Sequence, residues 1–119
     1  MSRDWLLYLE DVAQAAEKIG RFTDGIQIDK FHPQSPIFDA VLFNLQIIGE
    51  ATKNLPDEAR TAMPKVAWTK AARFRDLIAH HYFALDHAIV WDVVTGLVPD
   101  IAVAARRLLT TLDGDSTNR

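Results

Sequence analysis

The stretch that decides the fold class is Ile37-Phe38-Asp39-Ala40-Val41-Leu42-Phe43-Asn44-Leu45-Gln46-Ile47-Ile48, residues 37–48 of the chain. Only Asp39, Asn44 and Gln46 interrupt its apolar residues, so a helix built from it is apolar on nearly every face. A helix of this kind must pack against more than one neighbour. We therefore expect a long helix over residues 37–55 that packs against at least two other elements.

The sequence on either side of this stretch also has helical periodicity. Apolar residues recur three or four positions apart over residues 5–19, with Ser2 as a cap and Gly20 where this helix is expected to stop. A further helix is expected over residues 67–80, after a turn-rich stretch between two prolines at 56–64. No segment alternates with period two for long enough to indicate a sheet.

The last helix is expected to start at Asp86, an N-cap residue, and to reach Leu112. Pro99 lies inside it and should kink the helix or remove the hydrogen bond to Thr95. Residues 21–36 leave room for only a short helical piece, because they contain a turn and two prolines. The expected fold is therefore all-α: an up-and-down bundle of four main helices with a short extra helical piece. It forms one domain over residues 1–112, followed by a polar, flexible tail at 113–119.

The composition excludes several classes of protein. The chain has 119 residues, of which 49% are hydrophobic and 24% charged, as in ordinary globular domains. It has no cysteine, which excludes a disulfide scaffold, a thiolate zinc site, an iron–sulfur cluster and a cysteine nucleophile. No apolar run approaches the ~20 residues that cross a bilayer, and the amino end shows no secretory signal. We expect a soluble, cytoplasmic protein with no membrane contact.

The net charge of −3 conceals a basic segment. Residues 60–75 contain five cationic side chains and no acidic one, so this window carries +5 and the rest of the chain −8. Such a cluster is either a solvated helix face or a surface that holds phosphates. The five cations are Arg60, Lys65, Lys70, Arg73 and Arg75.

Reactive side chains concentrate in Arg73-Phe74-Arg75-Asp76-Leu77-Ile78-Ala79-His80-His81-Tyr82. Arg75 and His80 are five positions apart, which separates their side chains by about 140° on an ideal helix. Both can reach one point only if the helix ends near His80 or a second subunit contributes. Asp76 and His80 share a face, so the carboxylate could hold the imidazole in one tautomer. On spacing alone, the segment is either a reactive site or a helix end capped by a histidine with an aspartate partner.

Two further features concern charged and metal-binding residues. Glu50 lies in a very apolar stretch, where a carboxylate is either paired or functional, and we expect an ion pair with an arginine of the helix at 67–80. His80, His81 and His87 could in principle hold a metal, but adjacent imidazoles point apart on a helix. No metal site is therefore predicted.

The reactive segment resembles a known motif. Residues 75–82, Arg75-Asp76-Leu77-Ile78-Ala79-His80-His81-Tyr82, are similar to the R-x4-H-x-Y motif of the HepT-like branch of the HEPN superfamily. Four other landmarks of that family follow in the expected order, and together they cover most of residues 3–110. They are Ile48-Gly49-Glu50-Ala51, Pro64-Lys65-Val66-Ala67-Trp68, Ile89-Val90-Trp91 and Leu97-Val98-Pro99.

The resemblance implies the toxin of a bacterial toxin–antitoxin pair, a homodimeric, metal-independent endoribonuclease without a cofactor. By their places in the motif, Arg75 and His80 are the catalytic pair. Asp76 and His81 are the expected supporting residues; Asp76 stands where the family often has asparagine, and His81 would also fit a wider R-x5-H pattern, although the position of the tyrosine favours His80. Tyr82 is the tyrosine to which, in this family, an MNT-type nucleotidyltransferase antitoxin attaches AMP.

The chemistry of these residue types suits RNA cleavage. RNA supplies its own nucleophile, the 2′-OH, so the enzyme needs a base, an acid and a cation for the phosphate. An imidazole can be base or acid near neutral pH, and a guanidinium can bind two phosphate oxygens. One histidine cannot readily be both base and acid in one pass, so we expect a dimer to bring two Arg75–His80 pairs to one cleft.

The basic segment then becomes the wall that holds RNA. Lys65, Lys70 and Arg73 are the expected phosphate contacts. AMP on Tyr82 would place bulk and negative charge where an RNA phosphate must lie. The alternative is a non-catalytic helical dimer that binds a nucleotidyltransferase partner or a nucleotide.

Overall fold

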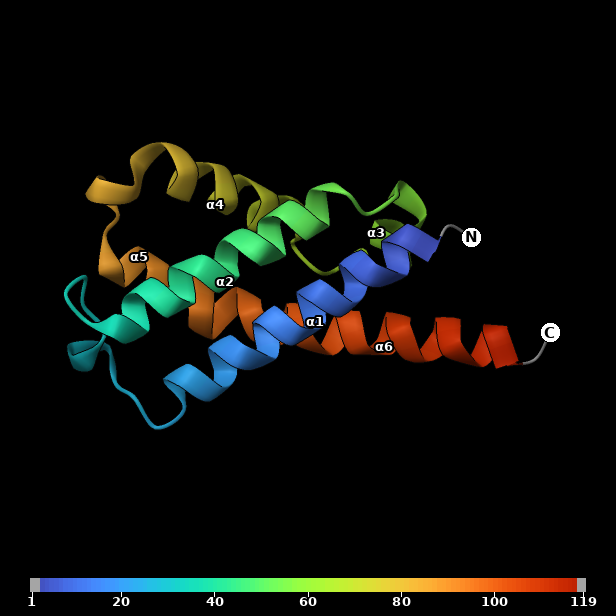
Figure 1. Cartoon of the computed structure of the whole chain (residues 1–119), viewed down its shortest axis with the longest axis horizontal. Helices are drawn as coiled ribbons and strands as arrows, with labels where there is room; N and C mark the ends of the chain where they lie inside the picture. The colour runs from blue at the N-terminus through green and yellow to red at the C-terminus, as the bar shows by residue number, and fades with distance from the viewer. Residues whose placement is uncertain (1–2, 118–119) are drawn as a thin grey trace.

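The computed structural model describes the backbone of residues 3–117 and the side chains of residues 5–111, and it contains no β-strand in that range (Figure 1). The expected all-α class is confirmed. Four long helical rods form the bundle, the last of them made of α5, a π-helical segment and α6. The elements are α1 (Arg3–Thr23), the 3-10 turn η1 (Ile28–Lys30), α2 (Pro36–Lys53), α3 (Asp57–Ala62), α4 (Trp68–His81), the 3-10 turn η2 (Tyr82–Ala84), α5 (His87–Asp92), the π-helical η3 (Val93–Leu97) and α6 (Val98–Thr117).

Helix α2 has two neighbours, as its sequence predicts. It packs against α1 and against α4, and α1 also packs against α6 (Figure 1). Asn44 is a buried polar residue of α2. Its burial is tolerated because its amide Nδ2 donates to the carbonyl oxygen of Ala40 at 2.8 Å. The helix therefore forms the layer that carries α4 on one side and α1 on the other. Its buried apolar residues are Phe38, Val41, Leu42, Leu45, Ile48 and Ala51.

The start of α2 follows a local rule, the end of α1 differs from the expectation, and Ser2, the expected cap of α1, lies outside the described residues. Ser35 caps α2 by accepting from the backbone N–H of Ile37 at 3.2 Å. α1 does not stop at Gly20 but continues to Thr23. The residue that turns the chain is Gly25, which has a φ of +74°, a conformation that favours glycine. Gly20 lies inside the helix, so α1 ends three residues later than expected.

The last rod starts as expected and is interrupted before its proline. Asp86 caps α5 by accepting from the backbone N–H of Ala88 at 2.8 Å. Pro99 has no N–H for the carbonyl of Thr95, and the turn before it is widened into the π-helical η3. The structure therefore places the disruption in residues 93–97. The helix continues beyond Leu112 to Thr117, so most of the expected tail has a helical backbone, and residues 118–119 lie outside the described residues.

By length and composition, the stretch His87–Thr111 is long and apolar enough to cross a membrane, which differs from the expectation of no membrane contact. Within its most apolar window, 44% of the residues are buried inside the bundle. Val90, Ile101 and Ala105 have no exposed surface at all. The core helix of a globular bundle passes the same test, so this one stretch is weak evidence for a membrane span.

Candidate active site

Helix α4 carries the reactive segment and is held by a buried apolar face. Trp68, Ala71, Phe74 and Ile78 point into the core from successive turns of α4. The indole N–H of Trp68 donates to the carbonyl oxygen of Met63 at 3.2 Å, which ties the start of α4 to the preceding loop. The opposite face of α4 is exposed and carries mostly polar side chains, with Leu77 among them.

Gly49 sets how closely α4 approaches α2. A Cβ at this position would lie 2.2 Å from the Cβ of Arg75 and 2.8 Å from the carbonyl oxygen of Ala71. Both distances are far below van der Waals contact, so only glycine lets the two helices meet here. The glycine of the Ile48-Gly49-Glu50-Ala51 landmark therefore positions Arg75 against α2.

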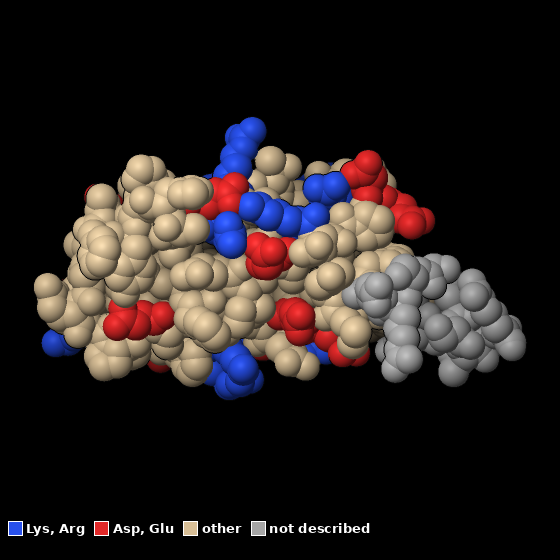
Figure 2. Space-filling model, turned by 45° about the horizontal axis from the view of Figure 1, so that its top comes forward, with Lys and Arg blue, Asp and Glu red and all other residues tan. Residues whose placement is uncertain are grey.

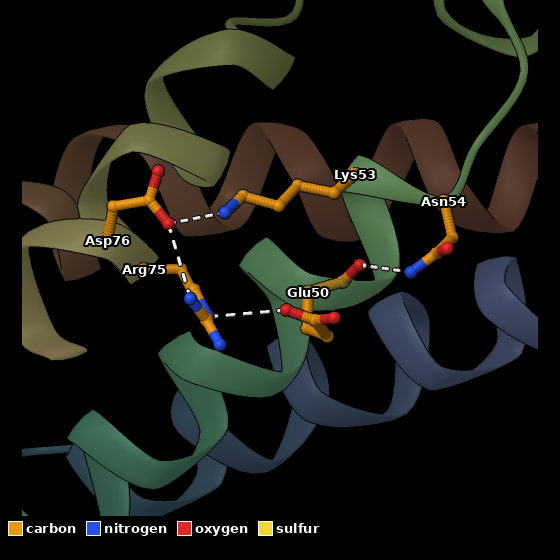
Figure 3. Close-up of polar contacts among 5 residues, drawn as sticks. All are labelled: Glu50, Lys53, Asn54, Arg75 and Asp76. Carbon is orange, nitrogen blue, oxygen red and sulfur yellow. Dashed lines mark hydrogen bonds and ion pairs between the residues drawn. The ribbon is translucent and has the colours of Figure 1, made fainter.

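The Arg75 side chain lies in a network of charges between the two helices (Figure 3). Its Nε is 3.2 Å from Oε2 of Glu50, and its Nη1 donates to Oδ1 of Asp76 at 3.3 Å. Lys53 of α2 forms an ion pair with the same carboxylate of Asp76. The predicted pairing of Glu50 with an arginine of this helix is confirmed. Two cations and two anions make the network neutral, and the Arg75 side chain remains 33% exposed.

Asp76 has other partners than the sequence predicts. The hydrogen bond from Lys53, and then that from Arg75, holds the pKa of the Asp76 carboxyl below its ordinary value of 3.8. Within the described residues, no hydrogen bond or ion pair joins Asp76 to His80. The expected orientation of the imidazole by Asp76 is not formed, because two permanently charged groups hold the carboxylate instead.

The two histidines lie at the exposed end of α4. α4 is continuous through His81, so Arg75 and His80 keep the angular separation of about 140° that their spacing dictates. Arg75 faces α2, whereas His80 and His81 are exposed to solvent. One chain therefore does not bring Arg75 and His80 to a common point.

Tyr82 follows directly after α4 and returns to the side of α2. It is seven positions, about two helical turns, after Arg75, and its Oη donates to Oδ1 of Asp39 at 3.0 Å. This hydrogen bond, together with the charge of Asp39, raises the pKa of Tyr82 above its ordinary value of 10.0. The ring is 44% exposed and meets the fully exposed Phe83 edge-on.

Sequence reasoning missed Asp39 and Lys53. Asp39 and Glu50 are eleven positions apart, about three helical turns, and so lie on one face of α2. That spacing is a signal in the sequence. It shows that the two carboxylates share a face, but it does not show that α4 and Tyr82 lie against that face.

The predicted phosphate contacts are exposed on and before α4. Lys65 precedes the helix, and Lys70 and Arg73 lie within it, all three on the surface. Arg60 is less available, because its Nη2 donates to Asp57 at 2.5 Å. Figure 2 shows lysine and arginine side chains gathered across the upper part of one face, with acidic side chains beside them. The basic segment is thus a partly neutralised surface.

Metal ligands do not gather in the described part of the chain. Among those residues, no three His, Asp or Glu side chains are placed to hold a metal ion together. His80, His81 and His87 form no such group.

The sequence of this chain matches a known protein family. Residues 12–108 match the family model described as ribonuclease HepT-like. The chain belongs to the HepT-like ribonuclease family. The matched residues run from within α1 to within α6 and include Arg75, His80 and Tyr82.

Several curated proteins are similar to most of the chain. The "Probable ribonuclease HepT" of Thermococcus cleftensis is 38% identical over 101 residues, which cover 85% of this chain and 92% of that protein. A candidate RNase of Methanocaldococcus jannaschii is 33% identical over 116 residues, covering 98% of this chain and 96% of its own length. A candidate RNase of Caldanaerobacter subterraneus is 33% identical over 102 residues, covering 86% and 91%. No solved structure matches the chain.

Proposed function

We propose that this chain is a metal-independent endoribonuclease whose active site is built by two copies of the chain. The observation that carries the proposal is the placement of Arg75. It is fixed between α2 and α4 and still partly exposed, in a member of a ribonuclease family. His80 stands one and a half turns further along the same helix.

The proposed reaction uses the 2′-OH of RNA as the nucleophile. This oxygen attacks the adjacent phosphorus, the bond from phosphorus to the 5′ oxygen breaks, and a 2′,3′-cyclic phosphate and a 5′-OH end are formed. One His80 imidazole accepts the 2′-OH proton while a second, protonated one donates a proton to the leaving oxygen. Arg75 binds the phosphate oxygens on which charge develops.

The two-copy site follows from the angle between the side chains. Arg75 and His80 diverge by about 140° on α4, so a substrate phosphate needs groups from a second α4 to be held from both sides. Exposed apolar side chains beside the site favour such an interface. Phe43, on the same face of α2 as Asp39 and Glu50, is 64% exposed, and Leu77 of α4 is 37% exposed.

The proposal includes regulation by a partner. An MNT-type nucleotidyltransferase antitoxin would attach AMP to the hydroxyl of the half-exposed Tyr82, which follows the helix that carries His80. The added phosphate would repel RNA and the nucleoside would fill its path. The chain would then be the toxin of a toxin–antitoxin pair that acts on RNA in the cytoplasm, with Lys65, Lys70 and Arg73 holding further phosphates.

The test is RNA cleavage by the purified chain, without its partner, in buffer that contains EDTA. We expect a labelled single-stranded RNA to be cut into fragments that end in a 2′,3′-cyclic phosphate. His80→Ala and Arg75→Ala should each reduce the rate by about 100-fold or more. His32→Ala, which removes an exposed histidine before α2, is the matched control and should cut normally. If the wild-type chain is dimeric and cuts no RNA, the proposal is wrong.

One observation favours the alternative of a non-catalytic dimer that binds a nucleotidyltransferase or a nucleotide. Arg75 already contacts the two carboxylates of Glu50 and Asp76, which compete with a phosphate for its guanidinium. In that case His80→Ala should leave both the toxicity of the chain in cells and its binding to the partner unchanged. Loss of toxicity in this variant decides for the nuclease.

A further inference from the structure

Asp39 has a contact that the nuclease chemistry does not use. Its Oδ1 accepts the hydroxyl hydrogen of Tyr82 at 3.0 Å, although the two residues are 43 positions apart in the chain. Both side chains are exposed, and Asp39 lies in the first turn of α2. A carboxylate in a first turn is explained by the helix dipole alone. The dipole does not explain why its oxygen is directed at the one tyrosine hydroxyl that follows the motif helix.

The geometry is that of a nucleophile and its base. A candidate base must lie within about 2.6–3.2 Å of the atom whose proton it removes, and Asp39 meets this condition without any rearrangement. Tyr82 also lies at the surface, where the residue is 44% exposed. An incoming electrophile can therefore approach the oxygen while the proton still faces the carboxylate.

We propose that Asp39 is the general base that activates Tyr82 for nucleotidyl transfer, so that this chain supplies part of the chemistry of its own modification. The inference rests on the proposed modification of Tyr82. Oη attacks the α-phosphorus of a nucleoside triphosphate held by the nucleotidyltransferase, forming a new P–O bond. The bond between the α-phosphorus and the bridging oxygen breaks, pyrophosphate leaves, and the phenol proton passes to Asp39 Oδ1 and then to water.

The same contact makes the phenolate of the resting tyrosine still less favourable. Asp39 raises the pKa of Tyr82, because a negative carboxylate disfavours a phenolate beside it. The phenol is thus a poor nucleophile until its proton moves to Asp39 as the new bond forms. Tyr82 would react when an electrophile is aligned with it, and stay inert otherwise.

A reagent that needs no partner tests the activation directly. N-Acetylimidazole acetylates accessible tyrosine hydroxyls, and peptide mass spectrometry reads Tyr82 and Tyr8 separately in the same sample. Asp39→Asn keeps a hydrogen-bond acceptor of the same size but cannot take the proton. We expect this variant to acetylate Tyr82 about tenfold more slowly or worse near neutral pH, while Tyr8 reacts as in the wild type. Asp29→Asn, which neutralises an exposed acidic residue of η1, should change neither rate.

The opposite outcome has a clear meaning. If Asp39 only anchors the ring and suppresses the phenolate, its loss should leave the Tyr82 rate unchanged or raise it, and the inference is wrong. Thermal unfolding of Asp39→Asn, compared with Asp29→Asn, shows whether the variant is folded. Asp39→Glu keeps a carboxylate at this position. If the slow reaction of Asp39→Asn is due to the missing base, Asp39→Glu should recover part of the rate.

The nucleotidyl transfer itself is measured in a second arm. Wild type and Asp39→Asn are each incubated with ATP, Mg²⁺ and the MNT-type nucleotidyltransferase proposed above as the partner, and the gain of AMP is followed by intact mass. We expect the variant to gain AMP at least about tenfold more slowly. Equal rates overturn the role of Asp39. No gain in the wild type contradicts the proposed modification instead, and the acetylation rates still decide whether Asp39 activates Tyr82.

Discussion

Replacing Gly49 with alanine tests how α2 positions Arg75. The new Cβ would lie 2.2 Å from the Cβ of Arg75 and 2.8 Å from the carbonyl oxygen of Ala71. Carbon atoms in contact are about 3.5–4.0 Å apart, so α4 must move away by roughly 1.5 Å. Neither obstructing atom is the free end of a flexible side chain, so the strain cannot be relieved by a rotamer change.

The size of the effect follows from two opposing terms. Overpacking of a close contact costs about 1–3 kcal/mol, and the 2.2 Å clash places Gly49→Ala at the upper end. Alanine gains about 1 kcal/mol over glycine inside a helix. We expect a net loss of about 2 kcal/mol, or roughly 8 °C in Tm. RNA cleavage should also fall, because the 3.2 Å contact between Arg75 and Glu50 is broken.

The matched control for this variant is Gly20→Ala in α1. A Cβ at Gly20 meets nothing within 4 Å, so only the gain in helix propensity applies and the variant should be more stable than the wild type. Urea unfolding measures both changes. If Gly49→Ala is as stable as the wild type, or gains stability as Gly20→Ala does, the reasoning about the α2–α4 contact is refuted.

Three further predictions concern charges and caps. Glu50→Gln should change the free energy of unfolding by less than about 1 kcal/mol, because the ion pair of Glu50 with Arg75 is exposed. It should still lower kcat/KM for RNA cleavage several-fold, because Arg75 loses its orientation. Unchanged kinetics would contradict this prediction. The two hydrogen bonds that Arg106 donates to Glu17 lower the pKa of that carboxyl below 4.5, so their stabilisation is complete above pH 4.5 and disappears as the pH falls through the lower folded-state pKa. The small stability difference between wild type and Glu17→Gln should therefore shrink from pH 7 to pH 3 in urea unfolding. A difference that grows over this range would contradict the lowered pKa of Glu17. Asp86→Ala should cost about 1 kcal/mol by loss of the α5 cap, and no loss in the same assay would show that the cap is unimportant.

The sequence was most informative where one residue acts through its own helix. The apolar run at 37–48 predicts two packing partners for α2, and Asp86 predicts the start of the last rod, because both depend on local periodicity and capping. The predicted ion pair of Glu50 with an arginine of α4 is also confirmed, although Glu50 lies at the surface and not in the apolar interior that its neighbours in the sequence suggested. Pro99 predicts a disruption of the last helix. Both a kink and a widened turn are compatible with a proline there, so the sequence does not predict the π-helical form of η3.

The contacts that the sequence did not reveal join α2 to α4 or to the turn after it. The pairs Asp39–Tyr82 and Lys53–Asp76 are 43 and 23 positions apart, and each depends on how far one helix slides along the other. Periodicity gives the faces of a helix but not this register. The close approach at Gly49 fixes it, and a single sequence does not show what a glycine in a helix touches.

The central claim is that two copies of the chain share one active site, and mixing wild type with His80→Ala tests it most directly. The two proteins are combined in equal amounts, allowed to exchange subunits, and assayed for RNA cleavage in EDTA. If each site needs both imidazoles, only wild-type dimers cut, and about one quarter of the activity of an all-wild-type sample remains. If about one half remains, each site needs only one imidazole, and a shared site that uses both His80 residues is contradicted.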